Sequence, residues 1–106
     1  MSDSRCTWDP SSFTARAIYT GENRLLRVRG SGRCPTGGST AELVAGNAGI
    51  HPDPSELVLQ IRETEPEMGT DALTPIEVDR AFEVEFGVHH VVIRSLHLRI
   101  DVIDPA

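Results

Sequence analysis

The most reactive combination of side chains in this chain lies in one glycine-rich segment, residues 30–38, which reads Gly-Ser-Gly-Arg-Cys-Pro-Thr-Gly-Gly. Glycines allow successive backbone N–H groups to surround an anion, and a neighbouring guanidinium favours the reactive thiolate form of a cysteine. Arg33 and Cys34 are therefore candidates for anion binding and for nucleophilic chemistry. The glycine spacing matches neither a P-loop nor a dinucleotide-binding fingerprint, and no helix is expected to follow. We favour a structural loop whose glycines adopt positive φ.

Histidine is the second residue type that suggests chemistry, and the chain has four: His51, His89, His90 and His97. A cysteine–histidine pair would require the fold to bring His51, His89 or His90 beside Cys34. His89 and His90 are adjacent, so in a strand they point to opposite faces and cannot hold one ion. No spacing resembles a zinc site. We expect no metal and no cofactor, and we predict that His90 pairs with Asp101 across a hairpin.

Carboxylates are numerous, but their spacing favours surface positions over catalysis. The segment 63–73 contains four acids (Glu63, Glu65, Glu67 and Asp71) without the ligand order or the glycine of an EF-hand, so it reads as a solvated loop. Two further pairs, Glu77 with Asp79 and Glu83 with Glu85, are spaced two residues apart along one strand. Glycoside hydrolysis needs carboxyl groups across a cleft, so these pairs indicate the wet face of an amphipathic strand.

The charge balance limits the partners. The chain has 106 residues and a net charge of −6, and all ten of its basic residues are arginine. Residues 1–40 carry six arginines against three acids, whereas residues 41–106 carry four against thirteen. The acidic total argues against DNA, RNA or an anionic membrane as the main partner. The absence of lysine excludes Schiff-base chemistry and a P-loop.

The compartment is predicted from the apolar runs and the cysteines. No run approaches the roughly 20 apolar residues of a membrane helix, and residues 1–8 contain no secretory hydrophobic segment. We therefore expect a cytoplasmic protein. Because the cytosol disfavours disulfides, Cys6 and Cys34 are expected to be free thiols.

These side chains must be positioned by β-strands. Alternation of apolar and polar residues predicts strands over 13–20, 24–30, 39–44, 56–64 and 74–85, followed by a hairpin over 88–103. A bulge is expected at Arg80, which falls on the apolar face of its strand. No segment has helical periodicity. We predict a flexible lead-in over residues 1–12 and one domain over 13–106. The expected fold is an all-β, antiparallel sandwich of two sheets and about seven strands, with Greek-key, immunoglobulin-like topology.

The hairpin has the best-defined register of the chain. A turn at residues 94–97 places Val91 opposite Ile100 and His90 opposite Asp101, which gives one apolar and one polar face. A slip of one residue would exchange the two faces, so this register is strongly specified.

Several apolar residues fall on faces that are otherwise polar: Leu25, Val44, Val58, Val92 and Ile103. If they share a surface, they form the kind of apolar patch that marks an interface. The first functional hypothesis is therefore a non-enzymatic interaction or structural module, self-associating as a homodimer through a sheet face that bears Leu25, Val44, Val58 and Val92.

The alternative hypothesis is a small enzyme or ligand-binding domain. Its site would lie at one end of the sandwich, where loops 30–38, 45–55 and 86–87 meet. The residues that would form it are Arg33, Cys34, His51 and His89. Binding sites favour loops on rigid frames, but the chain is poor in catalytic constellations, so we favour the first hypothesis.

Overall fold

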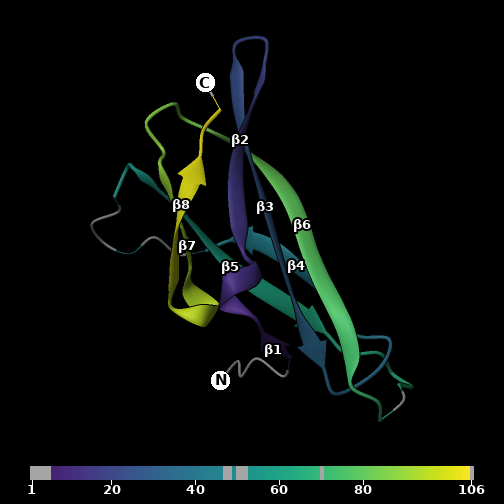
Figure 1. Ribbon diagram of the computed structural model, residues 1–106. Coiled ribbons are helices and arrows are strands. Elements are labelled where there is room, and N and C mark those ends of the chain that lie inside the picture. Colours follow the sequence, from purple (N-terminus) through teal and green to yellow (C-terminus); the bar gives the residue numbers. More distant parts are fainter. Residues whose placement is uncertain (1–5, 47–48, 50–52, 70, 106) are drawn as a thin grey trace.

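The computed structural model describes residues 6–46, 49, 53–69 and 71–105 (Figure 1). The all-β class is confirmed. The strands are β1 (Thr7–Trp8), β2 (Thr14–Thr20), β3 (Asn23–Cys34), β4 (Thr40–Ala45), β5 (Glu56–Thr64), β6 (Thr74–Val84), β7 (His90–Ile93) and β8 (Leu98–Ile103). Helical structure in the described ranges is limited to two 3₁₀ turns, η1 (Pro10–Ser12) and η2 (Arg94–Leu96). No helix among these residues is long and apolar enough to cross a membrane.

The strands form one curled, mixed sheet in the order β1-β3-β2-β8-β7-β5-β4, with β6 paired to β3. The predicted antiparallel, immunoglobulin-like pair of sheets differs from this arrangement, because β2 and β8 are parallel, as are β5 and β7. The physical reason is the position of the β7–β8 hairpin. It inserts between β2 and β5 and so joins what would otherwise be two sheets. Alternation along the sequence reports which face a residue occupies, not which strand lies beside it.

The predicted hairpin register is confirmed. His90 pairs with Asp101, Val91 with Ile100, Val92 with Arg99 and Ile93 with Leu98. The turn contains η2 and ends at His97, whose φ of 50° is left-handed. The polar face also behaves as expected, since His90 Nδ1 lies 2.9 Å from Asp101 Oδ1.

Arg80 connects the two edges of the curled sheet. Instead of the predicted bulge, β6 keeps a continuous register with β3 through the Val28–Arg80 pair. The guanidinium lies 4.9 Å from the centroid of the Phe82 ring, and its Nη1 donates a hydrogen bond of 2.7 Å to the Leu43 carbonyl of β4. Arg80 therefore bridges β6 and β4 where no ladder joins these two strands in the described residues.

The core is the concave face of this sheet. Inward positions of successive strands are fully buried, as the alternation predicts: Ala15, Leu26, Val28, Leu43, Leu59, Val91 and Ile93. The larger of these side chains each contribute about 1.5–3 kcal/mol when buried, so the apolar face supplies most of the driving force for curling.

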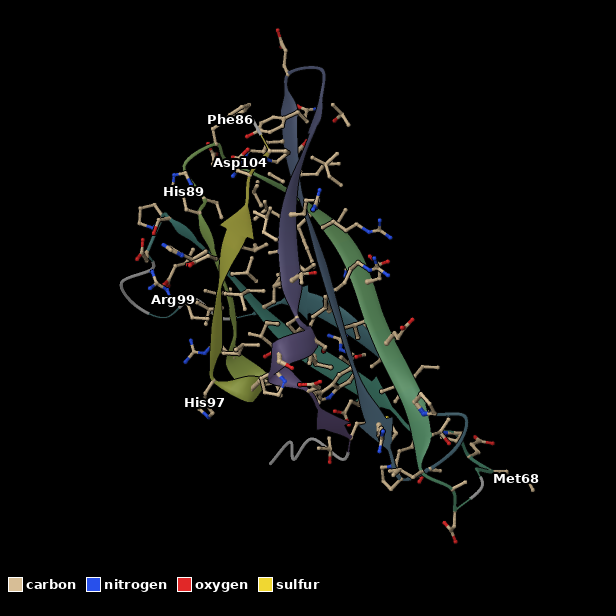
Figure 2. The ribbon with its side chains drawn as sticks, in the orientation of Figure 1. Met68, Phe86, His89, His97, Arg99 and Asp104 are labelled. Carbon is tan, nitrogen blue, oxygen red and sulfur yellow. A yellow bond between two sulfur atoms is a disulfide. The ribbon has the colours of Figure 1, made fainter. Side chains whose placement is uncertain are left out.

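A buried arginine closes one end of this core. Arg24 is two residues before Leu26, points inward with it, and is 1% exposed. Its Nη1 donates to the carbonyls of Val88 (2.7 Å) and Glu85 (3.2 Å). Its Nη2 donates to Asp104 Oδ2 (3.2 Å), close to Phe86 at the same end of the molecule (Figure 2). A buried charge is tolerated only when its donors are satisfied, and here they hold the β6–β7 connection and the C-terminal segment to β3.

We predict that Arg24→Met lowers the free energy of unfolding by about 2–4 kcal/mol, because buried carbonyls lose their donor at about 1–3 kcal/mol each. Arg24→Lys should also destabilise, since one ammonium cannot replace the planar fork. Urea titration measures both effects. Arg16→Met, on the exposed face of β2, is the control and should change stability by less than about 0.5 kcal/mol. Equal stability of Arg24→Met and the wild type would contradict this account.

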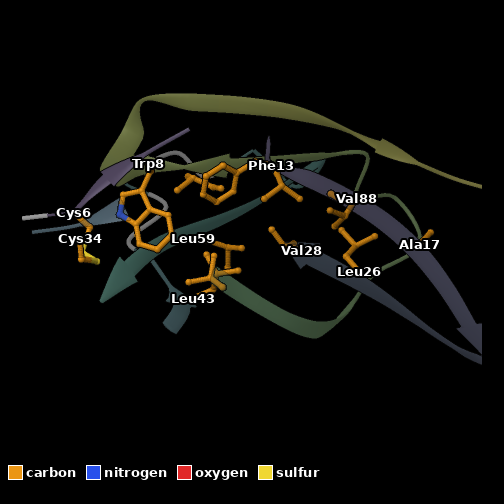
Figure 3. Packing of buried hydrophobic residues seen from close by; sticks show 14 residues of the cluster. Cys6, Trp8, Phe13, Ala17, Leu26, Val28, Cys34, Leu43, Leu59 and Val88 are labelled. Atoms are coloured by element: carbon orange, nitrogen blue, oxygen red, sulfur yellow. A yellow bond between two sulfur atoms is a disulfide. The ribbon is translucent and has the colours of Figure 1, made fainter. Parts of the chain in front are cut away.

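The N-terminal segment closes the opposite end. The part of residues 1–12 that the structure describes packs on the fold: β1 pairs with Gly32 and Arg33 of β3, and Trp8 is buried against Phe13 (Figure 3). Cys6 and Cys34 form a disulfide with their Cα atoms 4.1 Å apart. The expectation of two free thiols is therefore wrong, because β1 brings together two cysteines that are 28 residues apart in the sequence. Glu63 accepts hydrogen bonds from Cys6 N (3.0 Å) and Trp8 Nε1 (2.9 Å).

We predict that reduction of this disulfide lowers the free energy of unfolding by about 3–4 kcal/mol, the chain-entropy value for a loop of this length. Trp8 is the single tryptophan, so its fluorescence reports the transition in urea with and without dithiothreitol. The Cys6→Ser/Cys34→Ser variant should unfold at the same urea concentration with or without reductant. An unchanged midpoint for the reduced wild type would show that the cross-link does not stabilise the fold.

The glycine-rich segment is not a loop throughout. Its first part, Gly30 to Cys34, continues strand β3. A Cβ at Gly30 would overlap the Phe13 ring, and one at Gly32 would overlap the backbone of β1. These glycines are therefore explained by close packing and not by an anion-binding turn.

Candidate functional site

The structure does not bring the four predicted ligand-binding residues together. Arg33 and Cys34 lie at the C-terminal end of β3, beside β1. His89 lies at the opposite end, where its N–H donates to the Ser55 carbonyl (2.8 Å). Ten residues of β3, about 33 Å of strand, separate Arg24 at that end from Cys34. His51 lies outside the described residues. Ser55 and the 85–89 connection thus lie at one end of β3, and Arg33 and Cys34 lie at the other.

Cys34 is further restricted by its disulfide and by burial, since it is 1% exposed. It therefore offers no thiolate while the bond is intact. In the described ranges, no group of three or more His, Cys, Asp or Glu side chains has an arrangement that could hold a metal ion.

Three of the four predicted interface residues do come together. Val58 of β5 pairs with Val92 of β7, and Val44 of β4 pairs with Gln60, two residues further along the same face of β5. All three valines are partly exposed on the outer face of these strands. Leu25 is separate, because it lies on β3 between Ile18 of β2 and Glu83 of β6. The predicted patch is thus a set of three valines on β4, β5 and β7, which we call the valine face.

Polar pairs border the valine face. Arg99 Nε donates to Glu56 Oε2 (3.0 Å), and His90 lies against Asp101 on the neighbouring strand. At the other end, Arg62 and Glu42 lie 3.4 Å apart. An apolar centre with a polar rim is the usual anatomy of a protein interface.

The half of the sheet that bears Leu25 is dominated by charge. Arg27 binds Asp79 through two hydrogen bonds, from Nε (2.9 Å) and Nη2 (2.6 Å), and Arg29 lies 3.5 Å from the same carboxylate. The hydrogen bonds from Arg27 lower the pKa of Asp79 below its ordinary value. Exposed pairs of this kind contribute little stability.

The lowered pKa of Asp79 predicts how the free energy of unfolding changes with pH. Its stabilising effect is complete above the ordinary pKa of an aspartate, near 4, and is lost as the pH falls through the lowered value. Asp79→Asn should therefore flatten the decline of the unfolding free energy below about pH 4, measured by urea titration at several pH values. Glu77→Gln, whose carboxylate has no ion-pair partner among the described residues, should keep the wild-type slope. A wild-type slope in Asp79→Asn would contradict the prediction.

Known proteins provide no guide to this surface. No model of a known protein family matches the chain, and no curated protein or solved structure shows a significant similarity to it.

Sequence reasoning did not predict the roles of two arginines that act within the fold: it expects a bulge at Arg80 and makes no prediction for Arg24. Arg24 and Arg80 both fall in phase with apolar neighbours, Leu26 and Phe82, and each binds a backbone carbonyl of a distant segment. The available signal was this phase, because an arginine on an apolar face requires a buried acceptor.

Proposed function

We propose that this chain is an interaction module that self-associates as a homodimer through the valine face. The observation that carries the proposal is the register that places Val58 beside Val92 and near Val44. These residues come from three strands, two of them parallel neighbours that are far apart in sequence. An apolar surface bordered by ion pairs satisfies the two requirements of a self-associating face, apolar area at its centre and charges of both signs at its rim.

The net charge of −6 opposes association, but its location limits the effect. Glu65, Glu67 and Asp71 lie in the connection between β5 and β6, and Glu77 and Glu83 lie on β6. Acids do border the valine face, among them Glu42 of β4 and Glu56 of β5, but each of these two has an arginine partner, Arg62 and Arg99. Repulsion beyond about 8 Å is largely screened at physiological ionic strength, so the surface at the valine face dominates.

The alternative proposal of a ligand site at one end receives less support. The candidate residues within the described chain are divided between the two ends of β3, so they cannot act on one ligand. Hydrogen-bond and proton-transfer chemistry requires its groups within about 3 Å of one another or of a shared substrate.

We predict that Val58→Asp abolishes the dimer, because it places a charge at the centre of an apolar contact. Sedimentation velocity at several protein concentrations measures the association. Leu25→Asp is the matched control, since it makes the same change at a partly exposed apolar residue on the other half of the sheet. A wild-type monomer at high concentration would refute the proposal, and dissociation by Leu25→Asp alone would move the interface to β3.

We also propose an oxidising compartment in place of the predicted cytoplasm. The support is the buried Cys6–Cys34 disulfide, since such bonds persist where thiols are oxidised. When the chain is isolated from its own source with thiols alkylated under denaturing conditions at lysis, mass spectrometry should find neither Cys6 nor Cys34 alkylated. Alkylation of both cysteines would restore the cytoplasmic assignment.

A further inference from the structure

We propose that the two copies meet antiparallel, across a two-fold axis that crosses β5 between Val58 and Gln60, so that Glu56 of each copy faces Arg62 of the other. This inference rests on the proposed dimer and adds the geometry of the partner. It follows from the distribution of charge around the valine face.

The outer face of β5 presents its residues in a fixed order. Because side chains alternate, Glu56, Val58, Gln60 and Arg62 point outward, whereas Leu59 between them is fully buried. The two central positions have apolar neighbours, Val92 beside Val58 and Val44 beside Gln60. Each central position thus has a valine neighbour, although Gln60 itself is polar, and the charged residues lie at the two ends of the face.

One end of the face is acidic. Glu56, Asp101 and Asp53 gather there around a single arginine, Arg99. His90 lies among them, between Glu56 and Asp101 in the sheet register. Asp53 belongs to this end because its carboxylate interacts with the charges of Arg99 and His90, although the Ser55 hydroxyl is the main cause of its lowered pKa. Three carboxylates against one guanidinium leave this end negative when His90 is neutral.

The other end presents an arginine. Arg62 and Glu42 lie there, with side chains 65% and 56% exposed, and their contact of 3.4 Å is long. The turn η2 is at the same end, where the hydroxyl of Ser95 accepts the Ile61 N–H (3.0 Å). Because Arg62 is well exposed and only loosely held by Glu42, a partner can contact its guanidinium. The exposed Arg94 of η2 adds a second positive charge at this end.

In a two-fold dimer, the difference in charge between the two ends of β5 favours one relative orientation of the two copies. Glu56 and Arg62 are six residues apart, about 20 Å along the strand, which exceeds the screening length of about 8 Å. Each end therefore responds mainly to what faces it directly. A two-fold axis through the middle of β5 reverses the strand and sets the acidic end against the arginine end twice in the dimer. A dimer with its β5 strands parallel would oppose like charges at both ends. Exposed pairs of this kind fix register and partner choice, while the valines supply affinity.

Charge exchange tests the orientation. Arg62→Glu should weaken the homodimer because the introduced carboxylate would face Glu56 at both ends, and Glu56→Arg should do so by the converse pairing. We expect the dissociation constant to rise about tenfold or more for each variant, with a larger effect at low salt. An equimolar mixture of the two should form heterodimers in preference to either homodimer. In the heterodimer one facing pair is the native Glu56 and Arg62. The other joins the carboxylate introduced at position 62 to the guanidinium introduced at position 56, so both pairs attract. Native mass spectrometry counts the species and sedimentation velocity measures affinity.

Controls separate this proposal from simple disruption. Circular dichroism confirms that each variant is folded, which matters for Glu56→Arg because that change removes the Arg99 contact. For the neutral pair Arg62→Gln and Glu56→Gln the heterodimer keeps one native Glu56–Arg62 pair and contains no repulsive pair, so the preference for heterodimers should be weaker than that of the charge-exchange pair. Arg16→Glu, an exposed charge reversal on β2, should leave the dissociation constant unchanged.

These experiments test the valine-face dimer and its antiparallel orientation separately. If the wild type dimerises and Val58→Asp dissociates it, but the mixture of charge variants gives only statistical heterodimers, the antiparallel orientation is wrong and the valine-face dimer stands. If Arg62→Glu dimerises as well as the wild type, the orientation is also wrong. If the wild type is monomeric, the proposed function fails and this inference fails with it.

Discussion

A single sheet with one apolar face must bury that face against itself, and most features of this fold follow from that constraint. Strand after strand presents its aliphatic residues to one side, and no helix of the described chain is available to cover them. The sheet therefore curls until its edge strands β4 and β6 approach. No ladder joins these two strands in the described residues, and the Arg80 side chain of β6 reaches the Leu43 carbonyl of β4 instead. A long side chain at this position occupies an edge that could otherwise pair with another chain.

Curling leaves two open ends, and the chain closes them by opposite chemistry. At one end a buried guanidinium, Arg24, gathers backbone carbonyls and the Asp104 carboxylate. At the other, the Trp8 indole covers the core, held by the Cys6–Cys34 bond and by the Glu63 carboxylate. The first solution requires complete hydrogen bonding, because a buried charge with missing partners is costly. The second uses apolar area, which is not directional, and a covalent cross-link, whose geometry is specific.

The outer surface divides into two halves with different character. The β2–β3–β6 half is lined with arginines and acids, including the bidentate Arg27–Asp79 pair. The β4–β5–β7 half carries the valine face, with charged residues confined to its margins. The proposed dimer uses the second half because apolar area gives affinity there, while the unequal ends of β5 give a reason for one relative orientation over another.

The sequence alone determined the local and periodic features. The two-residue alternation located the longer strands, the inward residues such as Leu26 and Leu59, and the register of the hairpin, because each of these depends on neighbours only a few positions apart. It also marked Val58 and Val92 as apolar residues on polar faces. It did not reveal that they are adjacent.

Only the tertiary structure decided the contacts between distant segments. The parallel pairing of β5 with β7 gathers the valine face, and β1 brings Cys6 to Cys34 across 28 residues. The length of β3 separates Arg33 from the end of the sheet where His89 lies, and the packing of distant segments supplies the carbonyls that Arg24 and Arg80 bind. These outcomes depend on which strands pair across long stretches of chain, and the free energy that selects the pairing belongs to the whole assembled core and to no single segment.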